Sequence, residues 1–102
     1  MYELVVTFRG IPKWTGEGDY LSFILGHVDP EKYINSVVKL QERITFQPHK
    51  VSDDPSISVI STSRGETLAD IEWARDYYVS IIPDWITEFP NLNISFEINE
   101  VT

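Results

Sequence analysis

The sequence of 102 residues contains no cysteine, and this absence excludes several kinds of site. Disulfides, thiolate zinc sites and cysteine nucleophiles are all ruled out. Long apolar runs are missing too, since none approaches the roughly 20 residues that a membrane-spanning helix requires. The N-terminus also lacks the basic and then apolar layout of a signal peptide. We therefore expect a soluble, cytoplasmic protein.

Basic side chains are scarce, with 8 lysines and arginines against 16 aspartates and glutamates, for a formal net charge of −8. Residues 1–51 are neutral, whereas residues 52–102 hold ten acids and two arginines, so the second half carries the whole net charge. An acidic surface repels nucleic-acid phosphates and anionic membranes, so neither is expected as a partner. It attracts a protein with a basic surface, although net charge also simply keeps small proteins soluble.

Recognised catalytic and nucleotide-binding motifs are also absent, including the phosphate-binding loop, the dinucleotide-binding glycines and the zinc-protease helix. His27 and His49 are the only histidines. His49 could form a loose metal site with Asp53 or Asp54, and either histidine could act with a carboxylate in an enzyme. Solvated and helix-capping roles are the simpler interpretation. The prediction is therefore no enzyme, no catalytic residue, no metal and no cofactor.

The chain is rich in apolar residues, with 42% hydrophobic and 13% aromatic content. That composition suits one folded domain over residues 1–102. Residues 19–36 are ambiguous, since Asp19 can cap a helix, Asp29 with the following proline is a typical helix start, and a strand at 20–25 is the alternative. Elsewhere the apolar periodicity predicts strands at residues 2–9, 38–47, 56–62 and 92–101, and a helix over 66–89 that is kinked or divided at Pro83.

The resulting order is strand, helix, strand, strand, helix, strand. This order predicts an α+β fold of the ferredoxin-like split βαβ type (β-α-β-β-α-β), with a four-stranded antiparallel sheet and two helices on one face. The same fold supports many unrelated functions, so the fold does not by itself predict a function.

One side of the helix at 66–89 carries the main candidate binding surface. Trp73 and Tyr77 are four residues apart on its polar side, so their rings are neighbours. Tryptophan and tyrosine are enriched in binding hot spots, and carboxylates suit a rim that faces lysine and arginine. The acids around the pair are Glu66, Asp70 and Asp76. A partner surface, cover by another part of the chain, and a homodimer contact all remain open.

Three further residues are secondary binding candidates. Lys13 and Trp14 lie in the long loop of residues 10–19, and long loops are often functional. The same loop, or the first helix, could instead cover Trp73. Glu97 lies on the polar side of the last strand, which we expect to be the open face of the sheet.

Together these features favour a small acidic protein-binding module that occludes a basic surface of a partner protein. Inhibitors, immunity proteins and phage anti-defence proteins have this general character. In this interpretation Trp73 and Tyr77 anchor the partner and the surrounding acids steer it. The alternative is a homo-oligomeric, small-molecule-binding regulatory module, such as a homodimer, with a pocket near Trp14 and the open sheet face.

Overall fold

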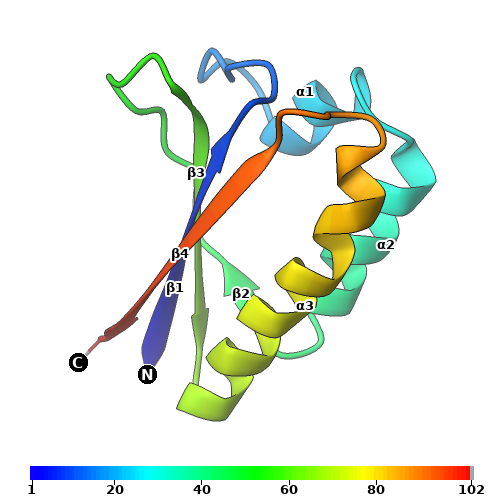
Figure 1. The fold of residues 1–102 in the computed structure, drawn as a ribbon. Helices are drawn as coiled ribbons and strands as arrows, with labels where there is room; N and C mark the ends of the chain where they lie inside the picture. Colours follow the sequence, from blue (N-terminus) through cyan, green and yellow to red (C-terminus); the bar gives the residue numbers. More distant parts are fainter. Residues whose placement is uncertain (102) are drawn as a thin grey trace.

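The computed structural model describes residues 1–101 as four strands and three helices (Figure 1). In chain order these are β1 (Tyr2–Arg9), α1 (Tyr20–Leu25), α2 (Pro30–Leu40), β2 (Thr45–Phe46), β3 (Ile57–Gly65), α3 (Leu68–Ile86) and β4 (Asn93–Glu100). The strands form one antiparallel sheet in the order β2-β3-β1-β4, with α2 and α3 side by side on one face. The predicted α+β class and four-stranded antiparallel sheet are confirmed, with three helices instead of two. Within residues 1–101, no helix has the length and apolar character needed to cross a membrane.

The core lies between the sheet and the helices. Every second side chain of the central strand β1 faces the helices and is buried, namely Leu4, Val6 and Phe8. The β3 positions opposite Leu4 and Val6 are occupied by Ser63 and Ser61, which are also buried. Because serine is much smaller than the aliphatic residues usual in a core strand, β3 leaves space between the sheet and the helices.

The ambiguous segment at residues 19–36 forms two helices, each capped by an aspartate. Asp19 Oδ2 accepts a hydrogen bond from the N–H of Ser22 at 3.2 Å, and Asp29 Oδ1 accepts one from the N–H of Glu31 at 2.9 Å. Both are N-caps that satisfy otherwise unpaired helical N–H groups. Gly26 is the C-cap of α1 and so separates the two helices.

The predicted strand at residues 38–47 is wrong over most of its length. α2 continues through Leu40, and only Thr45–Phe46 form β2. Leu40 is 2% exposed and lies seven residues after the buried Tyr33, which is two helical turns. Val38, assigned to the buried side of the expected strand, is 57% exposed. Over so few residues, the apolar positions of a helix can look like the alternation of a strand.

The long helix is confirmed, but it runs over Leu68–Ile86 instead of residues 66–89 and is not divided at its proline. Thr67 is the N-cap, with its Oγ1 accepting a hydrogen bond from the N–H of Asp70 at 3.1 Å, so Glu66 precedes the helix. Pro83 does not divide α3, which continues to Ile86. Proline removes one helical hydrogen bond, to the carbonyl four residues earlier, at Val79. The Val79 side chain is exposed, so water can replace that bond.

The end of β1 requires a glycine. Gly10 has a φ of +83°, and a Cβ at this position would lie 1.9 Å from the carbonyl oxygen of Asn91. Only glycine accommodates both the left-handed backbone and this close approach. The contact ties the exit of β1 to the chain just before β4, and the loop that follows leads back to α1 (Figure 1).

Candidate functional site

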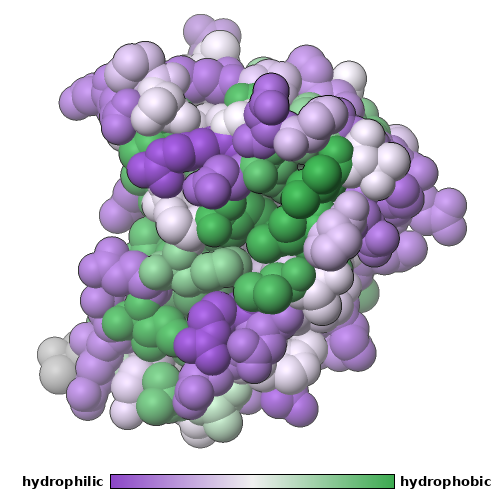
Figure 2. All heavy atoms as spheres, in the orientation of Figure 1, coloured by the Kyte–Doolittle hydropathy of each residue, from purple (hydrophilic) through white to green (hydrophobic). Residues whose placement is uncertain are grey.

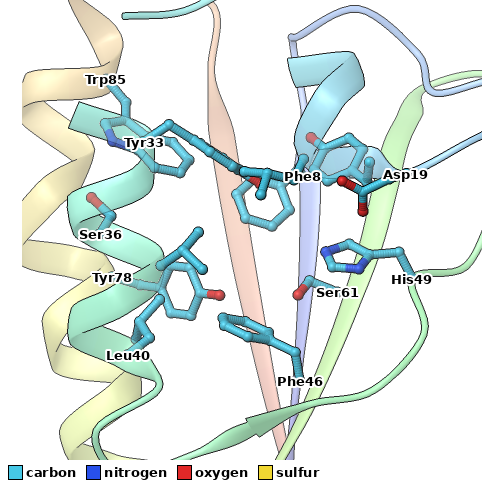
Figure 3. A pocket seen from close by; sticks show the side chains of 13 residues that line it. Phe8, Asp19, Tyr33, Ser36, Leu40, Phe46, His49, Ser61, Tyr78 and Trp85 are labelled. Atoms are coloured by element: carbon cyan, nitrogen blue, oxygen red, sulfur yellow. The ribbon is translucent and has the colours of Figure 1, made fainter. Parts of the chain in front are cut away.

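A cavity of about 160 Å³ lies between the sheet and the helices (Figure 3). We call it the aromatic cavity because six of its thirteen lining residues are phenylalanine, tyrosine or tryptophan. All three helices and the strands β1, β2 and β3 contribute to it. The lining residues are Phe8, Asp19, Tyr20, Leu21, Tyr33, Ser36, Val37, Leu40, Phe46, His49, Ser61, Tyr78 and Trp85.

Two hydroxyl groups face each other across the aromatic cavity. Tyr78 extends from α3 and Ser61 from β3, and in Figure 3 their oxygens point toward one another. Burial raises the pKa of Tyr78 above its usual value, and the facing Ser61 hydroxyl acts in the opposite direction. The phenol therefore stays protonated at neutral pH. Each of the two hydroxyls can donate or accept a hydrogen bond.

Two more phenols line the aromatic cavity, from α1 and α2. Burial is the main reason that the pKa values of Tyr20 and Tyr33 are raised, and neighbouring tyrosines add to the effect. The Asp19 carboxylate raises the pKa of Tyr33 a little further. The inner wall is thus polar at several points and uncharged.

Asp19 and His49 form the rim of the aromatic cavity. The His49 ring packs against Tyr20 with 5.0 Å between ring centroids and stacks on Phe46 at 6.4 Å. Burial lowers the pKa of His49, and the nearby Asp19 charge only partly offsets this, so the imidazole is neutral at neutral pH. Asp19 is exposed, and Figure 3 shows its carboxylate beside the His49 ring. The rim therefore carries a negative charge.

The residue types of a hydrolytic triad, Asp19, His49 and Ser61, all line this cavity. The Asp19 carboxylate is instead held by Ser22, whose backbone N–H and hydroxyl both donate to Oδ2. Ser61 lies in β3, which pairs with a strand on each side. Paired strands use their backbone N–H groups in the sheet, so they offer no oxyanion hole. The geometry suits binding better than nucleophilic catalysis.

The alternative metal site on the loop before β3 is not assembled. The Asp54 carboxylate accepts hydrogen bonds from the backbone N–H of Ser56 at 2.9 Å and from its hydroxyl at 2.7 Å, and these bonds lower the pKa of Asp54. His49 packs in the aromatic cavity instead. Over the described part of the chain, no three histidine or carboxylate side chains gather closely enough to hold a metal ion.

The aromatic pair expected on the long helix is present on a surface that we call the outer side of α3, although both side chains also pack against the core. The rings of Trp73 and Tyr77 stack with 5.7 Å between centroids and 10° between planes, and both side chains are half-buried. The Arg43 guanidinium, from the turn after α2, lies 4.9 Å from the centroid of the Trp73 ring. Part of the cover over this pair thus comes from a cation–π contact within the chain.

Two of the three acids near this pair already have partners. Asp70 accepts a hydrogen bond from the Thr67 hydroxyl at 3.0 Å as part of the helix cap. Asp76 accepts one from Arg75 at 3.2 Å in an exposed ion pair. Glu66 is exposed just before the helix. The surface retains negative charge, although much of it faces groups of the same chain.

The secondary candidates are scattered. Trp14 is 7% exposed and packs against Tyr20 with 5.6 Å between ring centroids. Lys13 Nζ holds the loop before β3 by donating to the carbonyls of Ser52, Asp54 and Ile57 at 2.9 to 3.2 Å. Glu97 is exposed on the face of the sheet away from the helices. These residues do not form one site.

Sequence reasoning missed the aromatic cavity, although it expected a pocket near Trp14. One signal was available, because Ser61 and Ser63 occupy alternate positions of a strand and so share a face. Small residues on the buried face of a core strand leave room that the opposite layer has to fill.

The chain matches no protein-family model, and no curated protein or solved structure is significantly similar to it.

Proposed function

We propose that the protein binds a small organic molecule in the aromatic cavity. The observation that carries this proposal is a cavity of about 160 Å³ whose walls combine aromatic rings with convergent hydroxyl groups. An apolar cavity of about 150 Å³ is large enough to hold benzene. A molecule with a single ring, or of similar bulk, therefore fits this space. Empty space in a core weakens packing, and an occupant would restore the lost contacts.

The direct test is a titration with single-ring molecules, benzyl alcohol and benzylamine, followed by amide NMR shifts. We expect saturable shifts that centre on the walls of the aromatic cavity, at Ser61 in β3 and Tyr78 in α3. Shifts that are absent for both probes, or that lie on the open sheet face, would contradict the proposal.

A substitution that fills the cavity with a larger side chain tests whether the probes bind there. Ser61→Leu adds bulk to the wall of the aromatic cavity, since Ser61 is buried and faces the helices. We expect this variant to stay folded by circular dichroism and to lose most of its affinity for either probe. The control is Ser95→Leu, which makes the same change at an exposed position of β4. Equal binding by the two variants would place the probe outside the cavity.

The ferredoxin-like description of the fold is likewise a proposal. It is supported by the two halves of the chain, each a strand, a helix on the same face and a second strand, around the central pair β1 and β3. The two-residue β2 and the additional helix α1 depart from the simplest scheme. Binding of a small molecule in the cavity would suit the alternative function predicted from the sequence, a small-molecule-binding regulatory module. A cytoplasmic location stays a prediction.

The regulatory module predicted from the sequence is homo-oligomeric, and we propose that two copies pair through β4. β4 ends the sheet, and Figure 2 shows a hydrophobic band along the seam between β4 and α3. Pairing two antiparallel β4 strands around Phe96 would place Ile94 of each copy opposite the other copy's Ile98. The same register keeps Glu97 from facing itself. Sedimentation over a wide concentration range should show a monomer–dimer equilibrium, and a strict monomer would contradict this pairing.

The second candidate function is binding of a basic partner protein by the outer side of α3. The half-exposed Trp73–Tyr77 stack favours it, because large aromatic anchors beside carboxylates suit a surface rich in lysine and arginine. The whole net charge of −8 lies in this half of the chain. The mechanism would be occlusion of the basic surface, as in an inhibitor or immunity protein.

Its test is affinity capture from the native host with wild type and with a Trp73→Ala, Tyr77→Ala double variant. A partner held by this surface should be lost from the double variant and should associate more slowly at higher salt. The control is Val79→Ala, since Val79 is exposed on the same helix. Retention of the same partner by the double variant would contradict the assignment.

A further inference from the structure

We infer that the molecule bound in the aromatic cavity is a small organic cation, with an ammonium or trimethylammonium group held among the rings. The inference rests on the proposed small-molecule function and adds the chemical class of the ligand. Three features of the lining carry it: the sign of the charge on the rim, the ring faces of the inner wall, and the hydroxyls that are left for hydrogen bonding.

The first feature is charge. Neither lysine nor arginine occurs among the thirteen lining residues, all of which lie within the described chain. Asp19 is the carboxylate of the lining, and the neighbouring His49 imidazole is neutral at neutral pH, so it does not cancel this charge. An anionic ligand would enter beside Asp19 with no cation to pair with. A cation would gain from Asp19, and from the net charge of −8 during its approach.

The availability of the Asp19 carboxylate follows from its hydrogen bonds. Both contacts to Ser22 use the same oxygen, Oδ2, which leaves Oδ1 for another partner. The carboxylate is exposed and stands at the rim in Figure 3, so a bound cation would reach it from inside the cavity while the cap stays intact. Asp19 would thus be a counterion and a helix cap at once.

The second feature is the set of ring faces. A cation is attracted to the face of an aromatic ring within about 6 Å of its centroid, most strongly for tryptophan and where water is excluded. Trp85 packs against Tyr33 at 5.5 Å and stacks on Phe8 at 6.3 Å between ring centroids, so rings from α3, α2 and the sheet form one cluster and cover part of one another's faces. The faces that remain for a cation are those that line the cavity. Tyr20 adds a ring from α1 to the same lining. Aromatic rings that present their faces to a bound cation are the usual sites for quaternary ammonium groups.

The third feature is hydrogen bonding. Tyr78 and Ser61 can each accept a hydrogen bond from an ammonium N–H or engage a hydroxyl elsewhere on the ligand. Ser36 is less available, because its hydroxyl donates to the Lys32 carbonyl at 2.9 Å. A ligand with a cationic head and one polar group beyond it would therefore satisfy the rings, the rim carboxylate and the hydroxyl pair together.

The test compares choline with its neutral carbon isostere, in which a tert-butyl group replaces trimethylammonium. The two molecules share shape and hydroxyl group and differ in charge. Isothermal titration calorimetry should show choline binding about tenfold more tightly or better, which is the scale of a desolvated cation–π contact. Amide NMR shifts should place both molecules in the aromatic cavity.

Asp19→Asn is the decisive variant, because asparagine caps helices as well as aspartate does and the variant should therefore fold. We expect it to lose affinity for choline severalfold while its affinity for the isostere is unchanged. The matched control is Asp29→Asn, which removes the same charge from the equivalent cap of α2, outside the cavity lining. This control should leave both affinities unchanged.

The outcomes separate this inference from the function on which it rests. If the isostere binds as tightly as choline, or if Asp19→Asn and Asp29→Asn behave alike, the cationic class is overturned while binding in the cavity stands. If choline, the isostere and the single-ring molecules all fail to bind, the proposed function fails with it.

Discussion

The aromatic cavity and the outer side of α3 both bring aromatic rings together with carboxylates, yet they differ in what the rings contact. On α3, Trp73 and Tyr77 stack on each other and Arg43 covers the tryptophan, so their faces are largely occupied. In the aromatic cavity the rings also pack on one another, as Trp85 does on Phe8, but they line a space of about 160 Å³. A ring that already has partners gains little from a ligand, whereas rings around a gap gain new contacts.

The two regions also differ in where they lie along the chain. Ten of the thirteen lining residues of the aromatic cavity belong to residues 1–50, where acids and bases balance. The outer side of α3 belongs to the acidic second half. The charge excess therefore belongs to the half of the sequence that contains α3, while the cavity depends on one carboxylate, Asp19, placed at its rim.

The largest expected difference between the regions is in stability. Leu40 lines the aromatic cavity and is 2% exposed, so Leu40→Ala should lower the free energy of unfolding by about 3 kcal/mol. Trp73→Ala should cost about 1 kcal/mol, because its ring is half-buried and the site is open to water. Urea denaturation measures both values. Equal losses would mean that the stack on α3 is part of the core.

The next effect is the response to high pH. Burial raises the pKa values of Tyr20, Tyr33 and Tyr78, so the folded state keeps protons that the unfolded chain loses above pH of about 10. The stabilisation is therefore complete below that pH and is lost as pH rises, by about 1.4 kcal/mol per pH unit for each such tyrosine. Tyrosinate absorbance and denaturation at several alkaline pH values would follow it.

A matched pair of substitutions at adjacent positions assigns part of this slope to the cavity. Tyr78→Phe removes a buried phenol from the aromatic cavity. Above pH of about 10, the free energy of unfolding of this variant should fall less steeply with pH, by the contribution of one tyrosine. Tyr77→Phe makes the same change on the outer side of α3, where the ring is half-buried, and serves as the comparison. Identical alkaline slopes for the two variants would contradict the burial that distinguishes them.

A smaller effect should appear on the acid side. Burial lowers the pKa of His49 more than the facing Asp19 charge raises it, and Tyr20 is the other titratable group packed against the ring. The unfolded state thus binds a proton more readily, so stability falls as pH drops below about 6.5, by less than about 1.4 kcal/mol per pH unit. His49→Gln should flatten this part of the curve. His27→Gln, at an exposed position, is the control, and equal curves would rule out the burial of His49.

The sequence was sufficient for features set by local chemistry. The start of α2 follows from a capping aspartate before a proline, and the course of β1 follows from alternating apolar residues that extend over eight positions. The end of α2 was not predictable in the same way. Val38 and Leu40 satisfy a period of two over a short stretch, and only the burial of Leu40 on the core-facing side of α2 decides in favour of the helix.

The cavity was beyond local reasoning for a different reason. Its walls come from six of the seven elements, and its volume depends on side chains that are smaller than their neighbours, such as Ser61. The placing of Asp19 and His49 on one rim brings together residues thirty positions apart, across the two helices α1 and α2. The stack of Trp73 on Tyr77 was predictable because both belong to one helix, while its cover by Arg43 was not.

The smallest expected effect concerns that cover. Arg43→Gln removes the cation above the Trp73 ring and should cost about 0.5–1 kcal/mol, the range for cation–π contacts at exposed sites. It should also change the tryptophan fluorescence. The control is Lys39→Gln, which removes the same charge from an exposed ion pair with Glu42, and such pairs contribute little. If Arg43→Gln costs no more than the control, Arg43 does not hold the stack. Trp73 would then be free to meet a partner, and the contrast between the two regions would narrow.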